Sequence, residues 1–203
     1  MVSSAGRRGR DKRGQSTSRR VGRPRRPAPV FRGLGRDVDP AAVDSTDVEA
    51  YLVGVDPSVR DDPAAAAELL ARRRFAVPTV VTSLDGDELE VDPADEDQRE
   101  LLIVAEHPQY RQVLDDPFSD ELVDGVNPRL HVVMHRIITN QLWDDTPPEV
   151  WQAAERLLAG GHDRHDILHA LAYELSQELH PVMTGEHVPD PEMSAYRDRL
   201  RAL

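Results

Sequence analysis

The chain has 203 residues, of which 39% are hydrophobic, 31% charged and 4% aromatic, and its net charge is −12; this leaves room for one domain of ordinary size with flanking segments. It contains no cysteine, which excludes disulfides, a thiolate zinc site and a cysteine nucleophile, so any metal must be held by nitrogen and oxygen. No stretch approaches the ~18–20 apolar residues of a membrane helix, and the N-terminus lacks the apolar core of a secretory signal, so we expect a cytoplasmic protein.

Positive charge is concentrated at the N-terminus. Residues 1–36 carry twelve Arg or Lys side chains and one acid, a charge of +11, whereas residues 37–203 carry thirteen against thirty-six, a charge of −23. The basic segment is rich in Arg, Gly, Ser and Pro and has almost no apolar content, so it cannot bury enough surface to offset the loss of chain entropy on folding. We therefore expect residues 1–36 to form a disordered arm.

Within this arm, Gly22-Arg23-Pro24-Arg25 resembles the centre of an AT hook, a motif that lays arginines into a narrow minor groove, although Val21 stands where that motif has a basic residue. Cations that neutralise phosphates release counterions, so such an arm can contact nucleic acid or an acidic partner. The candidates for nucleic-acid contacts are Arg23, Arg25 and Arg26. Two alternatives stay open: the arm folds back on the acidic body, or an upstream start codon adds residues that the native protein lacks.

Residues 37–94 have a less regular pattern and are interpreted as a linker. A short helix fits within residues 38–53, and a firmer one begins at Pro63, because a proline without an N–H is tolerated in the first helical position. Farther on, Asp85-Gly86 separates two β-rich runs, as in a two-residue hairpin turn. A small hairpin and an extended linker fit residues 77–91 equally well.

A helical pattern dominates the domain that we assign to residues 95–187. Asn127 and Pro128 mark one helix start, and Pro181 should end the last of these helices. A further helix at the C-terminus carries an apolar stripe that docks on the core or binds a partner. The sequence therefore predicts a mostly all-α fold, a bundle of about five helices. The predicted helices of this bundle cover residues 93–107, 108–115, 128–143, 149–159 and 163–181, and the C-terminal helix, residues 191–203, lies in a separate segment, residues 188–203.

Two of these helices each carry a His-x-x-x-His pair, His131 with His135 and His165 with His169. At 100° per residue, the apolar side chains of each helix fall on one face, and the histidines lie along the edge of that face. The four histidines should therefore sit at the rim of a buried seam. The predicted core faces are Leu130, Val133, Met134, Ile137, Ile138 and Leu142 on the first helix, and Ile167, Leu168, Leu171, Ala172, Leu175 and Leu179 on the second.

This spacing is typical of metal-binding sites, because two histidines four residues apart on a helix present their ring nitrogens to one point. Zn²⁺ and Fe²⁺ accept imidazole nitrogen at ~2.0–2.1 Å, so two such helices could supply a complete set of ligands. The candidate ligands of a divalent metal, Zn or Fe, are His131, His135, His165 and His169. The outer candidates are His180 and Glu106, and His107, Glu174 and Glu178 are further partners to consider. The alternative is that all of these histidines are structural and hydrogen-bonded at the edge of the core.

Neither histidine pair is the zinc-protease motif. The first pair has no acid after His131, and the second has Asp166 where that motif needs the longer glutamate as general base, so peptide hydrolysis is disfavoured. An ion with an open coordination position could still activate water for hydrolysis, but nothing in the sequence demands a reaction. The leading hypothesis is a metal-binding helical protein. The alternative is a non-enzymatic binding module that acts through residues 1–36.

Four motifs carry a family resemblance: Asn127-Pro128-x-Leu130-His131-x-x-x-His135, then Asn140-Gln141-Leu142, then Pro147-Pro148-Glu149, then Gly161-His162-Asp163-Arg164-His165-x-x-Leu168-His169. Together they resemble a bacterial domain family of unknown function that is small, mostly helical and found in some proteins next to zinc-binding knuckles. The resemblance covers residues 95–181. It implies a fold and no activity, and the histidines are the residues that match positions marked by the family pattern.

Overall fold

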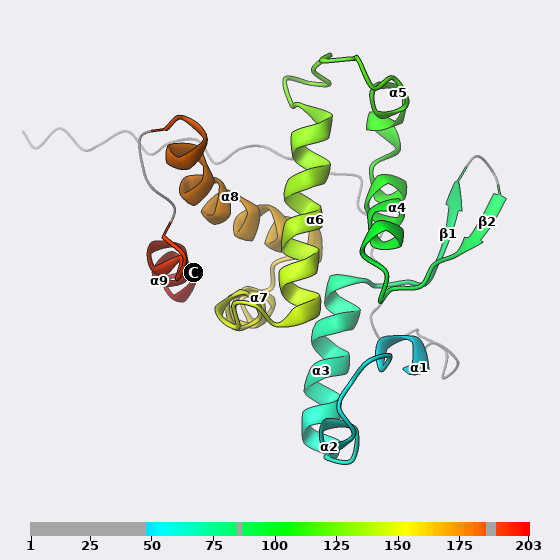
Figure 1. The fold of residues 1–203 in the computed structure, drawn as a ribbon, viewed down its shortest axis with the longest axis vertical. Coiled ribbons are helices and arrows are strands. Elements are labelled where there is room, and N and C mark those ends of the chain that lie inside the picture. Colours follow the sequence, from blue (N-terminus) through cyan, green and yellow to red (C-terminus); the bar gives the residue numbers. More distant parts are fainter. Residues whose placement is uncertain (1–47, 85–86, 186–189) are drawn as a thin grey trace, which may run out of the picture. The chain divides into compact units, whose positions relative to one another are not determined.

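The computed structural model describes residues 48–84, 87–185 and 190–203. The chain divides into two units, residues 1–33 and 34–203, and all of the described residues lie in the second. This described part contains nine α-helices, one short 3-10 turn and a single two-stranded hairpin (Figure 1). The predicted all-α class is confirmed, whereas the predicted disordered arm lies outside the described residues.

The first described elements are α1 (Val48–Tyr51), α2 (Pro57–Arg60) and α3 (Pro63–Ala76). The Asp62 side chain caps α3 by accepting hydrogen bonds from the N–H groups of Ala64 and Ala65. The α1 residue Tyr51 is fully buried, and its hydroxyl donates to the Val77 carbonyl at 2.7 Å. This bond ties α1 to the end of α3.

The strands β1 (Val81–Leu84) and β2 (Asp87–Glu90) pair antiparallel, with Val81 opposite Glu90 and Leu84 opposite Asp87. Of the two interpretations of residues 77–91, a small hairpin and an extended linker, the structure therefore shows the hairpin. Its flanks enter the core, since Val80 and Val91 are both buried and the Val91 N–H donates to the Val80 carbonyl at 2.7 Å.

The remaining helices follow the predicted order; Asn127 caps α6 as expected, and Asp163 caps α8. The predicted end at Pro181 is wrong, because α8 continues to Met183. A proline removes only its own N–H hydrogen bond and crowds the preceding turn, and this destabilises a helix little when it happens in the last turn. The last turn of α8 is closed by the Thr184 N–H, which donates to the His180 carbonyl. The elements are α4 (Glu96–Glu106), η2 (Pro108–Tyr110), α5 (Arg111–Asp115), α6 (Pro128–Asp144), α7 (Glu149–Ala159), α8 (Arg164–Met183) and α9 (Ser194–Arg201).

Helix α6 is the central element, and α3, α4, α7 and α8 all pack on it (Figure 1). Its predicted core face is partly wrong, because Leu130 and Val133 are 54% and 38% exposed whereas His135 is 2% exposed. The helix is rotated so that the histidine side faces its neighbours. A helical wheel that assigns only apolar residues to the core face leaves His135 at the edge of that face. In the structure, neighbouring helices enclose this neutral side chain. The buried residues of α6 are Pro128, Val132, His135, Ile138, Thr139, Leu142 and Trp143.

The C-terminal helix α9 docks on α7 and α8. Its two inward side chains, Tyr196 and Leu200, are fully buried. Arg199 of α9 forms ion pairs with Glu174 and Glu178 of α8, so these two acids serve the docking interface. Of the helices in the described ranges, none combines the length and the apolar character needed to cross a membrane.

Candidate metal centre

His107 lies at the C-terminal end of α4, which stops at Glu106 because residue 107 precedes Pro108 and a residue before proline avoids the helical region. Its ring is 1% exposed, and Nδ1 lies 2.7 Å from the Ile103 carbonyl oxygen. A carbonyl can only accept, so Nδ1 carries the proton and Nε2 carries a lone pair. The backbone therefore directs a metal-binding nitrogen of His107 away from its own helix.

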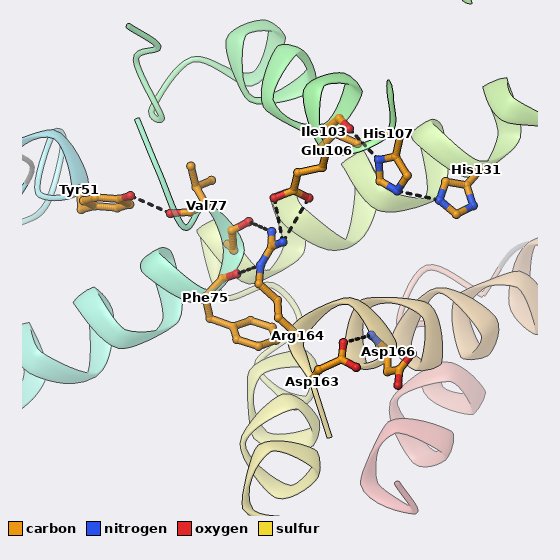
Figure 2. A network of polar contacts seen from close by, with 11 residues as sticks. Tyr51, Phe75, Val77, Ile103, Glu106, His107, His131, Asp163, Arg164 and Asp166 are labelled. Atoms are coloured by element: carbon orange, nitrogen blue, oxygen red, sulfur yellow. Dashed lines mark hydrogen bonds and ion pairs between the residues drawn. The ribbon is translucent and has the colours of Figure 1, made fainter. Parts of the chain in front are cut away.

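The pair on α6 lies directly opposite this nitrogen. Nε2 of His131 is 3.0 Å from Nε2 of His107 (Figure 2). The ring of His135 stacks on that of His131 with a centroid distance of 4.5 Å and lies 4.8 Å from the ring of His107. One turn of α6 thus places both imidazoles against the end of α4.

The pair on the first turns of α8 meets the pair on α6. The rings of His165 and His169 are 4.4 Å apart, and they lie 5.1 Å and 5.0 Å from the ring of His135. The four histidines predicted as ligands are therefore brought together, and His107 joins them. We call these five residues the histidine cluster: His107, His131, His135, His165 and His169.

Four members of the histidine cluster, His107, His131, His135 and His165, each offer one ring nitrogen within 4.8 Å of the others. This group could hold a metal ion. A tetrahedral ion at ~2.0–2.1 Å from each nitrogen separates its ligands by about 3.4 Å, so modest ring rotations close the group around an ion. The His107–His131 nitrogen distance of 3.0 Å is already close to that value.

His135 gives the most specific indication of a ligand. Its side chain is buried, and neither ring nitrogen has a hydrogen-bond partner among the residues that the structure describes. Buried polar atoms are nearly always paired, because an unpaired one has lost water without replacement. A metal ion bound by one of these nitrogens would offset that loss, so the donor set fits a metal on structural grounds.

Burial lowers the pKa of every histidine in the cluster, since a charged imidazolium is poorly solvated there. The pKa falls to about 3 for His131 and to about 4 for His169, with the neighbouring imidazoles as the next cause. The pKa values of His107, His135 and His165 are lowered by the same burial. The imidazoles are therefore neutral at pH 7, which is the protonation state that binds a metal.

Neither of the two outer candidates belongs to the group of four residues that could hold an ion. Figure 2 shows the Glu106 carboxylate directed toward Arg164, which binds both of its oxygens at 2.9 and 3.1 Å. His180 is exposed near the end of α8, about 16 Å along the helix from His169 at ~1.5 Å per residue. His107, by contrast, belongs to that group. The sequence indicated it only as a further partner, because no histidine lies four residues before or after it.

The residues predicted to contact nucleic acid, Arg23, Arg25 and Arg26, lie outside the described residues. Their assignment stays a prediction from charge and motif.

The described part of the chain thus defines a helical protein with a partly buried histidine cluster that could hold a metal. Comparison with family models identifies a domain of unknown function, DUF1841, over residues 86–201, more than half of the chain. The chain belongs to this family. Comparisons with curated proteins and with solved structures gave no match. The predicted resemblance to a family of unknown function is confirmed, and the individual motif positions stay a prediction.

Proposed function

We propose that this protein binds one divalent metal ion through the histidine cluster. The nitrogens of His107, His131, His135 and His165 form the closest group, and the ring of His169 lies beside them, 5.0 Å from that of His135. The observation that carries the proposal is the buried His135, whose two ring nitrogens lack partners among the described residues and which four other imidazoles surround.

The donors favour an ion of intermediate softness. Imidazole suits Zn²⁺ and Fe²⁺, whereas Mg²⁺ and Ca²⁺ prefer oxygen and Cu⁺ prefers sulfur. The chain has no cysteine, and the acid closest in sequence to His107, Glu106, is occupied by Arg164. We therefore propose Zn²⁺ or Fe²⁺ as the bound ion.

Binding would join three separate segments of the chain, namely the end of α4, the first half of α6 and the start of α8. A ligand that binds the folded state and not the unfolded state stabilises folding by mass action, so the ion has a structural role whatever else it does. If one coordination position stays open, the ion would also lower the pKa of a bound water and support hydrolysis. That is the reaction class this site would serve.

The test is metal content, measured by mass spectrometry on untagged protein purified without chelator. The double variant His131→Ala, His169→Ala should lose the metal that the wild type holds. The matched control is His180→Ala, which removes an exposed histidine of α8 and should keep it. A wild type that holds no metal even after incubation with Zn²⁺ or Fe²⁺ would end the proposal and return the histidines to a structural role.

The competing function, a binding module that engages nucleic acid or an acidic partner through residues 1–36, rests on the charge of +11 in that segment. It is compatible with a metal site, because the two functions use different parts of the sequence.

A further inference from the structure

Arg164, the first residue of α8, is bound by the ends of two other helices (Figure 2). Its Nη1 group donates to both carboxylate oxygens of Glu106, at 2.9 and 3.1 Å. Nε donates to the Phe75 carbonyl at 2.7 Å, and Nη2 donates to the Ala76 carbonyl at 2.8 Å. Every guanidinium nitrogen has a partner, so the group is held in one orientation.

These partners suit an arginine specifically. Phe75 and Ala76 are the last residues of α3, where carbonyl groups have no helical N–H to accept from and the helix dipole is negative. Glu106 is the last residue of α4, and both of its carboxylate oxygens accept from Nη1 alone, which leaves Nε and Nη2 for the two α3 carbonyls. Arg164 thus joins the ends of α3 and α4 to the start of α8. A lysine, with a compact ammonium group, could not reproduce this arrangement.

The two charged residues directly precede two members of the histidine cluster. Glu106 is followed by His107, and Arg164 is followed by His165. The rings of these two histidines have centroids 5.2 Å apart. Helices α4 and α8 each pack on α6, and the ion pair adds a direct tie between them at the level of the cluster.

We propose that the Glu106–Arg164 ion pair positions the metal centre by setting the spacing between His107 and His165. This inference rests on the proposed function. The ion pair acts through the backbone of the following residue on each side, and Glu106 and Arg164 are positioning residues that do not touch the ion. Groups that orient metal ligands in this way change metal affinity by roughly 10–100-fold when they are removed.

The test is the variant Glu106→Gln, which keeps the size of the side chain and removes its charge. Zn²⁺ affinity is measured by competition with a chelator, and ligand geometry by the visible spectrum of the Co²⁺-loaded protein. We expect Zn²⁺ binding to weaken by roughly 10–100-fold and the Co²⁺ spectrum to change. A general loss of stability would not alter the spectrum of protein that remains folded and loaded.

The matched control is Glu100→Gln. Glu100 lies on the same helix and forms an ion pair with Arg136 of α6 at 2.6 Å, with a side-chain exposure of 38% against 29% for Glu106. Its loss should leave both the Zn²⁺ affinity and the Co²⁺ spectrum as in the wild type. An equal effect of the two variants would show that any ion pair on α4 matters and would overturn the positioning role.

The outcomes separate this inference from the proposed function. If Glu106→Gln binds Zn²⁺ like the wild type with the same Co²⁺ spectrum, the positioning role is overturned and the metal site stands. If the wild type binds neither ion, both are overturned. Should Glu106→Gln not fold, Arg164→Lys takes its place with the same expectations, because it keeps the charge but cannot bind the Glu106 carboxylate and both α3 carbonyls at once.

Discussion

The Nε2 atoms of His107 and His131 lie 3.0 Å apart, although 24 positions separate the residues in the chain and they come from different helices. The Ile103 carbonyl holds the proton of His107 on Nδ1, so the lone pair on Nε2 faces His131. In the metal-free protein, a proton on Nε2 of His131 joins the two rings. In the metal-bound protein that we propose, an ion would join them instead.

This relationship predicts that His107 is as important for metal binding as the histidines of the two His-x-x-x-His pairs. His107→Ala should weaken Zn²⁺ binding to a similar extent as His131→Ala, because both supply a nitrogen to the closest group. The measurement is a chelator competition. His162→Ala, which alters an exposed histidine just before α8, is the control and should bind like the wild type. Normal affinity in His107→Ala would remove this residue from the ligand set.

Replacing His135 by leucine should abolish metal binding and at the same time raise the stability of the metal-free protein. The variant His135→Leu loses a ligand and should no longer bind metal. Without metal, however, it should be more stable than the wild type by about 1–3 kcal/mol, because a buried imidazole with no partner among the described residues is replaced by an apolar side chain of similar size. Urea unfolding of both proteins in chelator checks this. A less stable variant would mean that the imidazole is satisfied in the metal-free protein.

Acid should weaken the docking of α9 through Glu149. This buried carboxylate accepts hydrogen bonds from Arg197 at 3.0 Å, and this partner, together with Arg201, lowers its pKa from 4.5 to about 2. The unfolded chain therefore binds the proton more readily, so the stabilisation is present above pH ~4.5 and is lost as the pH falls toward ~2.

The measurement is the free energy of unfolding as a function of pH for the wild type and for Glu149→Gln, both without metal. The wild type should lose more stability than the variant between pH ~4.5 and ~2, since the glutamine cannot be protonated in this range. Parallel curves for the two proteins would show that Glu149 has a similar pKa in the folded and unfolded states.

The C-terminal helix should contribute strongly to stability. Leu200 is fully buried where α9 packs on α7 and α8, so Leu200→Ala should lower the free energy of unfolding by about 2–5 kcal/mol. Asp198→Ala, on the exposed side of the same helix, should change it by less than about 0.5 kcal/mol. Equal stability of Leu200→Ala and the wild type would mean that α9 is not docked in solution.

The basic segment should bind nucleic acid in a manner that depends on salt. Removal of residues 1–36, which carry a charge of +11, should abolish binding to duplex DNA as measured by fluorescence anisotropy, and added salt should weaken the binding of the full chain. The triple variant Arg23→Ala, Arg25→Ala, Arg26→Ala tests the AT-hook resemblance. Unchanged binding after the deletion would contradict the prediction, as would the absence of binding by the full chain.

The sequence by itself determined where most helices begin and end. The caps of α3, α6 and α8 at Asp62, Asn127 and Asp163 are formed by side chains that bond to N–H groups two or three residues away, so they can be recognised in the sequence. The two His-x-x-x-His pairs were visible for the same reason, because one helical turn brings their members together. Local hydrogen bonds and helical period are properties of short stretches of chain.

Only the tertiary structure decided which sides of these helices face each other. The rotation of α6 that buries His135 and exposes Leu130 depends on α4 and α8, which pack against it from distant parts of the chain. His107 enters the cluster because the end of α4 meets α6, and no spacing rule connects residues 24 positions apart. Glu106 is occupied for the same reason, since its partner Arg164 lies 58 positions further along. Contacts of this kind are set by packing, and packing is a property of the whole fold.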